Sequence, residues 1–181
     1  MPAPKAKDVT VNVTLNSEKP GDFKIEPSPN GALPTGPDGE LIFRNAGHPG
    51  FFVVFHLIDL THQKYGFPPN SEKKAAVWST LKANACPGEP GEWAVFEPIS
   101  VSPDGMNLKV HNANVAPIVG LFSYTLRVTK DGGTKYLDLD PGGSNQNGPI
   151  GFVSPKPYVA FIVGAIVGAL AILGGQALLG R

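Results

Sequence analysis

The last two dozen residues of the chain form an almost uninterrupted apolar run. Residues 158–179 contain no charged side chain, and Gln176 is the one strongly polar residue among them. As a helix rising about 1.5 Å per residue, this run reaches about 33 Å, enough to cross a hydrocarbon layer of roughly 30 Å. Backbone groups in lipid must be hydrogen-bonded within their own segment. We therefore predict a single transmembrane helix over residues 158–179 rather than a buried core helix.

Small residues recur inside this run at spacings of three or four positions, which places them along one face of a helix. Such a face lets a second helix approach closely, so we expect contact with another copy of the chain or with another membrane protein. The expected contact residues are Ala160, Gly164, Gly168, Ala171 and Gly175. Because the N-terminal residues lack the apolar core of a signal peptide, we expect a C-terminal, single-pass anchor with the soluble domain on the cytoplasmic side.

Ahead of this run, apolar residues alternate with polar ones, as is typical of half-buried β-strands. The clearest alternation covers residues 9–15 and 120–129. The aromatic and β-branched run at residues 51–59 predicts a central strand buried on both faces. Further expected strands cover residues 40–45, 76–80, 93–97, 98–101, 107–112 and 136–140. Residues 71–81 favour at most one helical turn.

Turn signals separate these strands. Asp131-Gly132-Gly133 predicts a hairpin between residues 120–129 and 136–140, and the SPDG sequence at 102–105 predicts a second one. Many short strands with Gly and Pro turns predict an all-β fold, an antiparallel two-sheet sandwich of immunoglobulin-like or cupredoxin-like type. The expected organisation is a flexible N-terminus (1–8), the sandwich (9–140), a Gly/Pro-rich linker (141–157) and the transmembrane helix (158–179).

Charge and motifs exclude several functions. The chain carries 15 Lys and Arg against 15 Asp and Glu, so it lacks the basic excess of a nucleic-acid-binding protein and we expect no such partner. Its single cysteine allows no intrachain disulfide. No phosphate-binding glycine loop or nucleophile elbow is present. We therefore expect neither an enzyme nor a cofactor, with a hydrolase of dispersed site as an alternative.

Metal binding is a further alternative, because the chain contains four histidines and one cysteine. Blue copper needs two His, one Cys and a weak axial Met, and no His or Met closely follows Cys86. A different copper or zinc site remains open. Its candidate ligands are His48, His56, His62, His111 and Cys86.

A polar stretch near the end of the expected sandwich suggests a second kind of metal site. Calcium prefers oxygen ligands on a turning backbone. Candidate ligands are Asp138, Asp140, Asn145 and Asn147. The other interpretation is a strand end that runs into a polar linker.

Together these features favour a non-enzymatic interaction or scaffold module held at a membrane. An exposed sheet edge is its expected mode of interaction. The expected partners are the lipid bilayer and either a second copy of the chain or another membrane protein. A metal-binding or redox protein and an unrecognised hydrolase remain the alternatives.

Overall fold

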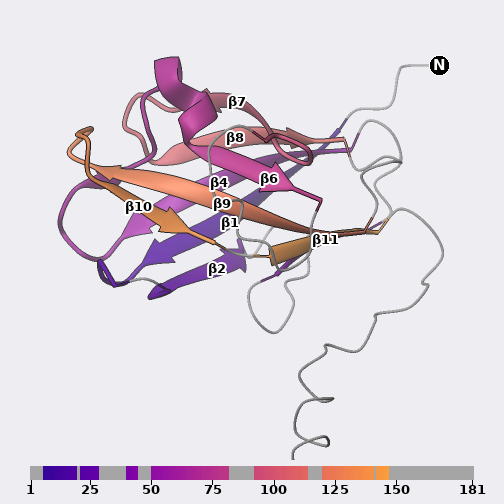
Figure 1. Ribbon diagram of the computed structural model, residues 1–181, viewed down its shortest axis with the longest axis horizontal. Coiled ribbons are helices and arrows are strands. Elements are labelled where there is room, and N and C mark those ends of the chain that lie inside the picture. Colours follow the sequence, from indigo (N-terminus) through magenta and orange to yellow (C-terminus); the bar gives the residue numbers. More distant parts are fainter. Residues whose placement is uncertain are drawn as a thin grey trace, which may run out of the picture. The chain divides into compact units, whose positions relative to one another are not determined.

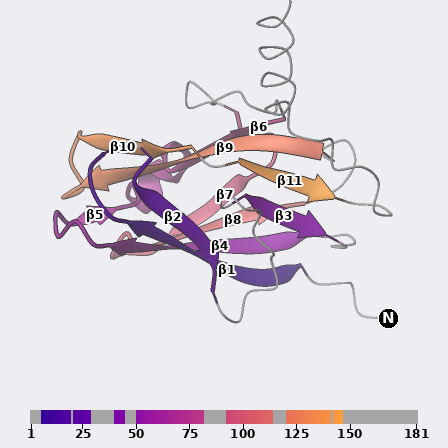
Figure 2. The ribbon, with the colours of Figure 1, turned by 90° about the horizontal axis from the view of Figure 1, so that it is seen from below.

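The computed structural model describes residues 6–19, 21–28, 40–44, 50–81, 92–113, 120–140 and 142–146. Within these residues the chain is mostly β-strand, arranged in two sheets that form the two layers seen in Figures 1 and 2. The all-β two-sheet sandwich predicted from alternation and turn signals is therefore confirmed.

The first sheet, sheet A, has five strands in the order β2–β1–β4–β8–β7. Their bounds are Phe23–Pro27 (β2), Lys7–Leu15 (β1), Phe51–Asp59 (β4), Asn107–Asn112 (β8) and Glu97–Val101 (β7). β1 pairs antiparallel with β2 but parallel with β4, with Val9 opposite Val53. β4, β8 and β7 pair antiparallel in turn.

The second sheet, sheet B, is built around the long strand β9 (Gly120–Lys130). β10 (Tyr136–Leu139) and β11 (Gly142–Gln146) pair antiparallel with β9, and β3 (Leu41–Arg44) pairs parallel with β11. β5 (Tyr65–Gly66) and β6 (Val77–Thr80) also pair with β9. A 3-10 helix, η1 (Asn70–Ala75), lies between β5 and β6 in the sequence.

The core lies between the two sheets and is rich in aromatic side chains. Phe55 and Phe96 meet edge to face at 5.7 Å between ring centroids, and Phe96 and Tyr124 do so at 5.1 Å. Rings in this relation gain about 0.5–1.5 kcal/mol beyond the area they bury. The alternating apolar residues of β1 and β9 supply much of the rest of this core.

Both predicted hairpins are confirmed. In the β9–β10 turn, Asp131 and Gly132 have φ of 51° and 64°, the two positive values that a type I′ turn requires. In the β7–β8 turn, Gly105 has φ of 71°, and its N–H donates to the carbonyl of Ser102 at 2.9 Å.

Two features of the strand pairing correct the sequence-based expectations. The sandwich is not purely antiparallel, because β1–β4 and β3–β11 are parallel pairs, and alternation along one strand carries no information about its neighbour's direction. β4 is a central strand as expected, but it is not buried on both faces. Phe51, Val53, Phe55 and Leu57 are buried, whereas the residues between them are partly exposed.

Strand boundaries also differ from those predicted. Residues 93–97 form no regular strand, because Trp93 makes an isolated bridge to Ser79 and β7 begins only at Glu97. The predicted linker begins too early, since β11 extends sheet B through residue 146. β1 begins at Lys7, inside the predicted flexible segment. β2 was not predicted because its alternation of apolar and polar residues is weak, and β5 was not predicted because it has only two residues.

Gly50 fixes the entry into β4 by a close backbone approach. Its φ is +89°, and a Cβ built on it would lie 2.1 Å from the carbonyl oxygen of Asn112 at the end of β8. Real Cβ atoms do not come so close to a backbone oxygen, so only glycine fits here.

Candidate functional site

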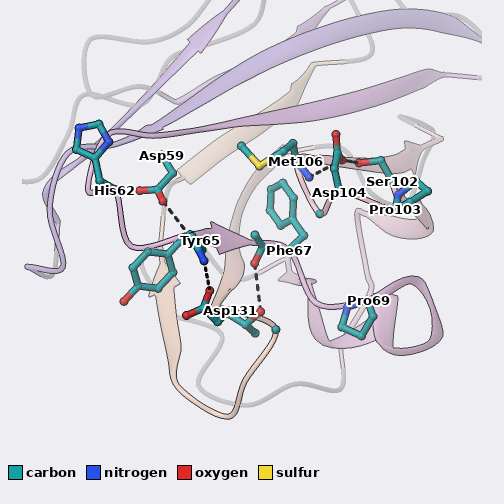
Figure 3. Close-up of a pocket in the computed structure, with 15 residues that line it drawn as sticks. Asp59, His62, Tyr65, Phe67, Pro69, Ser102, Pro103, Asp104, Met106 and Asp131 are labelled. Carbon is teal, nitrogen blue, oxygen red and sulfur yellow. Dashed lines mark hydrogen bonds and ion pairs between the residues drawn. The ribbon is translucent and has the colours of Figure 1, made fainter.

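One end of the sandwich carries a cavity of about 860 Å³ that three loops surround. These loops connect β4 to β5, β7 to β8, and β9 to β10. The lining residues, drawn in Figure 3, are Asp59, His62, Pro69, Thr129, Asp131, Gly132 and residues 64–67 and 102–106. A cavity of this size lies in the range of ligand pockets, about 300–1,000 Å³. We therefore treat it as the candidate functional site.

Asp59, the last residue of β4, organises the loop that follows. Its carboxylate accepts hydrogen bonds from the N–H and hydroxyl of Thr61 at 2.9 and 2.6 Å, and from the N–H of Tyr65 at 2.9 Å. Between them, His62 and Lys64 have positive φ of 59° and 57°. Burial acts to raise the pKa of Asp59, but these hydrogen bonds outweigh it and lower that pKa. Asp59 is thus an ionised anchor for the loop.

The β7–β8 turn is organised in a similar way. The carboxylate of Asp104 accepts from the hydroxyl of Ser102 and from the N–H of Met106, the latter at 3.0 Å. The Ser102 bond and then the Met106 bond lower the pKa of Asp104. The Ser102 oxygen also accepts from the N–H of Asn107 at 2.9 Å. This turn is therefore preformed.

Backbone hydrogen bonds join the three loops to one another. The N–H of Phe67 donates to the carbonyl of Gly105 at 2.8 Å, which connects β5 to the β7–β8 turn. The N–H of Asp131 donates to the carbonyl of Lys64 at 3.0 Å, which connects the β9–β10 turn to the β4–β5 loop. These two backbone hydrogen bonds thus fix the three loops of the rim relative to one another.

A side-chain cluster ties sheet A to the same end. The Tyr65 hydroxyl donates to Glu18 at 3.0 Å, and the Lys130 ammonium lies 3.2 Å from the same carboxylate oxygen. The Tyr65 bond and then Lys130 lower the pKa of Glu18, while burial and then Glu18 raise the pKa of Tyr65. Glu18 belongs to the loop between β1 and β2, so this cluster links both sheets.

The chemistry of the cavity suits binding. Phe67 and Tyr65 are nearly buried, with 3% and 7% of their surfaces exposed, and form apolar lining. Lys64 and Asp131 are strongly exposed, and their charged groups lie 4.0 Å apart. An apolar lining beside a few charged groups is typical of ligand or peptide recognition.

Three histidines of the proposed metal site are described, and the structure places them far from one another. His56 lies on the outer face of β4, with Nδ1 2.9 Å from Oδ1 of Asn107. His111 lies on β8 opposite Phe52, so it is four positions along the ladder from His56, about 13 Å at 3.3 Å per residue. His62 lines the cavity.

Among the described residues, no three His, Cys, Asp or Glu side chains gather closely enough to hold a metal ion. His48 and Cys86 lie outside those residues. The five-residue metal set therefore stays a prediction.

Three of the four residues proposed for calcium are described, and they lie in β10, directly after β10, and in β11. Asp138 pairs with Arg127 and Asn145 with Gly120, so these two candidates are separated along one ladder and do not surround a turn. Asp138 forms a two-bond ion pair with Arg127, at 2.7 and 2.8 Å. Asp140 accepts from the Thr125 hydroxyl at 2.5 Å. Asn147 lies outside the described residues.

The predicted transmembrane helix and its contact residues, Ala160, Gly164, Gly168, Ala171 and Gly175, also lie outside the described residues. In the part of the chain that the structure describes, no helix has the length and hydropathy needed to span a membrane.

Of the residues that line the cavity, sequence reasoning singled out His62, as a candidate metal ligand, and missed the residues that anchor its loops. Asp59 had a local signal, because an Asp at a strand end followed two positions later by Thr is typical of a side-chain-capped turn. The Glu18–Tyr65–Lys130 cluster had none, since its members are far apart in the sequence.

Fold and site together define a β-sandwich domain with a preformed, loop-lined cavity at one end. A scan against protein-family models finds no match, and a search of curated proteins finds no similar sequence.

Proposed function

We propose that the chain is a non-enzymatic interaction module, displayed at a membrane, that binds its partner with the cavity between the three loops. The observation that carries this proposal is the hydrogen-bonded rim: Phe67 to Gly105 and Asp131 to Lys64 hold three loops around a ready-made cavity. A preformed site loses little conformational entropy when it binds.

The carboxylates of the rim support binding over acid–base catalysis. Asp59 and Asp104 are both occupied by hydrogen bonds from their own loops, and both have lowered pKa values. A general acid or base works best with a pKa near the working pH, which for a carboxyl requires a raised value. These two residues are therefore better suited to fixing loops.

Of the two sandwich types, we favour the cupredoxin-like one. An immunoglobulin sandwich is built from two antiparallel sheets. Here β1 and β4 are parallel over nine residue pairs, in the centre of sheet A. This comparison concerns architecture and assigns no metal.

The location remains part of the proposal and is supported by the sequence. An uncharged run of 22 residues at 158–179 is long enough to span the bilayer. Its small-residue face supports contact with a second helix. Carbonate washing should leave the full chain with the membrane, and release into the wash would refute this part.

Site-specific photo-crosslinking tests the binding surface. A photoreactive amino acid is placed in the full chain at Lys64, on the rim, or at Lys24, an exposed position on β2 in sheet A. The two side chains are 84% and 64% exposed, so they are a matched pair. We expect a discrete crosslinked product in native membranes from position 64 and not from position 24. Products that are the same from both positions, or none from either, would contradict the proposed surface.

A further inference from the structure

The edges of the two sheets are not equally protected. An exposed edge strand carries unpaired backbone groups and can pair with another chain, so proteins usually cover or interrupt it. The edge of β7 is covered by η1: Asn70 accepts from the N–H of Val101 at 3.0 Å, and the Lys73 ammonium donates to the carbonyl of Ile99 at 2.7 Å.

Two other edges are also protected. Beside β6, Ser79 donates its N–H to the carbonyl of Glu92 at 2.8 Å and accepts from the N–H of Ala94 at 3.1 Å. β2 ends at Pro27, which has no N–H to offer, and Lys24 and Glu26 place a charged pair along it. These are common devices against edge-to-edge pairing.

β10 lacks such protection among the described residues. β10 and β11 follow one register along β9: Leu139 lies opposite Leu126, and Gly142 opposite Ser123. They therefore form one edge of sheet B (Figure 1). β3 covers this edge beside β11, and no described strand covers it beside β10. Among the described strands, the sheet edge is thus stepped, and it is open for the length of β10.

The hydrogen-bond pattern shows which groups are open. The carbonyl of Lys135 accepts from the N–H of Lys130 at 3.2 Å, so Lys135 is bonded to β9. Because inward and outward bonding alternate along an antiparallel strand, Leu137 and Leu139 also bond to β9. The N–H and C=O of Tyr136 and Asp138 then point away from β9. They form a two-residue template for another strand.

The side chains on β10 hold this template in place. Arg127 of β9 pairs with Asp138 and stacks on two rings, with its guanidinium carbon 4.6 Å from the ring centroid of Tyr136 and 4.8 Å from that of Trp78. On the other face, Leu137 packs against the core but is only partly buried. Further burial of Leu137 would favour an added strand.

We propose that a second copy of this chain pairs with β10 through its own β10, antiparallel, with the two Leu137 residues facing each other across a two-fold axis. In this register Tyr136 of each copy lies opposite Asp138 of the other, and both open residues make their two backbone hydrogen bonds. Leu137 of each copy becomes more buried, because it packs against Leu137 of the other copy. Arg127 already neutralises Asp138, so no unpaired charge enters the contact.

Neighbouring registers are less favourable. A shift of one residue would place side chains that face the core opposite side chains that face solvent. A shift of two in one direction would place the Asp138 residues of the two copies directly opposite each other, and like charges in that position destabilise a strand pair. A shift of two in the other direction would place Asp138 opposite Thr134, which lies before β10. The contact uses no residue that lines the proposed cavity and none of the proposed membrane helix, so failure of either proposal leaves it standing.

Cysteine cross-linking of the full chain in mild detergent tests the register. In a Cys86→Ser background, Leu137→Cys places two thiols at a non-hydrogen-bonded pair with Cα atoms about 4.5 Å apart, within disulfide range. Lys135→Cys is the matched control, because its partner in this register is Leu139. We expect at least a tenfold excess of disulfide-linked dimer for Leu137→Cys. Equal cross-linking at both positions, or none at 137, would overturn the proposal.

A backbone variant supplies the second test. Tyr136→Pro removes an outward N–H but no bond to β9, whereas Tyr136→Ala removes the side chain and keeps the N–H. Both variants are made with Leu137→Cys in the same background, and near-UV circular dichroism verifies the fold. Cross-linking should fall at least fivefold with proline compared with alanine. A folded proline variant that cross-links as well as the alanine variant would refute pairing through the strand edge.

Discussion

Replacing Tyr124 with phenylalanine should stabilise the protein. Tyr124 is fully buried between the sheets, and within the described part of the chain its hydroxyl has no hydrogen-bond partner. Its ring packs against Phe96, Phe55 and Phe122, with centroids 5.1, 5.8 and 5.9 Å away. The Tyr124→Phe substitution keeps these ring contacts and removes only the hydroxyl.

The size of the effect follows from the environment of the hydroxyl. Leaving a polar group buried without a partner costs about 1–3 kcal/mol. The small space left by one oxygen should return only a few tenths of a kcal/mol of that. We expect the free energy of unfolding to rise by about 1–2 kcal/mol, which for a chain of this size raises Tm by about 3–6 °C.

Alkaline pH should enlarge the difference. Burial raises the pKa of Tyr124 well above its usual range, so the folded state holds this phenol neutral. An unfolded tyrosine ionises near pH 10. Above that pH the wild-type protein loses stability as the unfolded state releases its proton, and the variant has no such group. The stability difference should therefore grow as the pH rises past 10.

Tyr65→Phe is the matched control, because the Tyr65 hydroxyl has a partner, Glu18, at 3.0 Å. The same chemical change should destabilise the protein there by about 1 kcal/mol. Thermal and urea unfolding of the full chain in detergent, followed by near-UV circular dichroism, measures both variants. Destabilisation by Tyr124→Phe of 0.5 kcal/mol or more, roughly the size of a weak hydrogen bond, would show that the hydroxyl is satisfied and refute the reasoning.

Three further predictions concern turns, loops and the tail. Gly132→Ala should lower the free energy of unfolding by about 1–2 kcal/mol, because of its positive φ alone. Gly50→Ala should lower it by about 3–5 kcal/mol, because the new Cβ would also meet the backbone at the end of β8. Equal losses for the two variants in urea unfolding would be inconsistent with the close approach at Gly50. Asp59→Asn should cost about 1–3 kcal/mol at pH 7, because an ionised acceptor of three hydrogen bonds is lost. The difference in stability should shrink below about pH 4, because protonation of the wild-type Asp59 carboxylate removes the stabilisation that its lowered pKa reflects. A difference in Tm that does not change with pH would argue against this role of Asp59. Gly164→Leu or Gly168→Leu should weaken self-association of the transmembrane helices at least severalfold in sedimentation experiments while leaving the Tm of the sandwich unchanged, and unaltered sedimentation would count against the small-residue face.

Much of the fold was predictable because strands with one buried face leave a period-two pattern. β1 and β9 alternate over most of their lengths, and both tight turns contain glycine where positive φ is required. β11 was missed because its sequence, GGSNQ, has no apolar residue. It forms a strand because β9 and β3 offer partners on its two sides, and this information lies elsewhere in the chain.

The cavity was less predictable than the fold. Its rim depends on contacts such as Phe67 to Gly105, which bring together residues from three separate loops. Composition singled out histidines and acidic residues instead. Among these, Asp138 forms an ion pair with Arg127, and His56 contacts Asn107. Residue type alone did not distinguish such partners from ligands.

The parallel pairing of β1 with β4 limits the order in which the domain can assemble during translation. β1 leaves the ribosome before the other strands of sheet A, and β2 can join it as a hairpin soon afterwards. The other neighbour of β1 is β4 (Phe51–Asp59), which is synthesised later. β8, the next strand of the sheet after β4, follows later still. Until then the nascent chain exposes one side of β1 to other chains. Removing the first strand would leave β4 as an open edge, so shortening the N-terminus past Lys7 should damage the middle of sheet A.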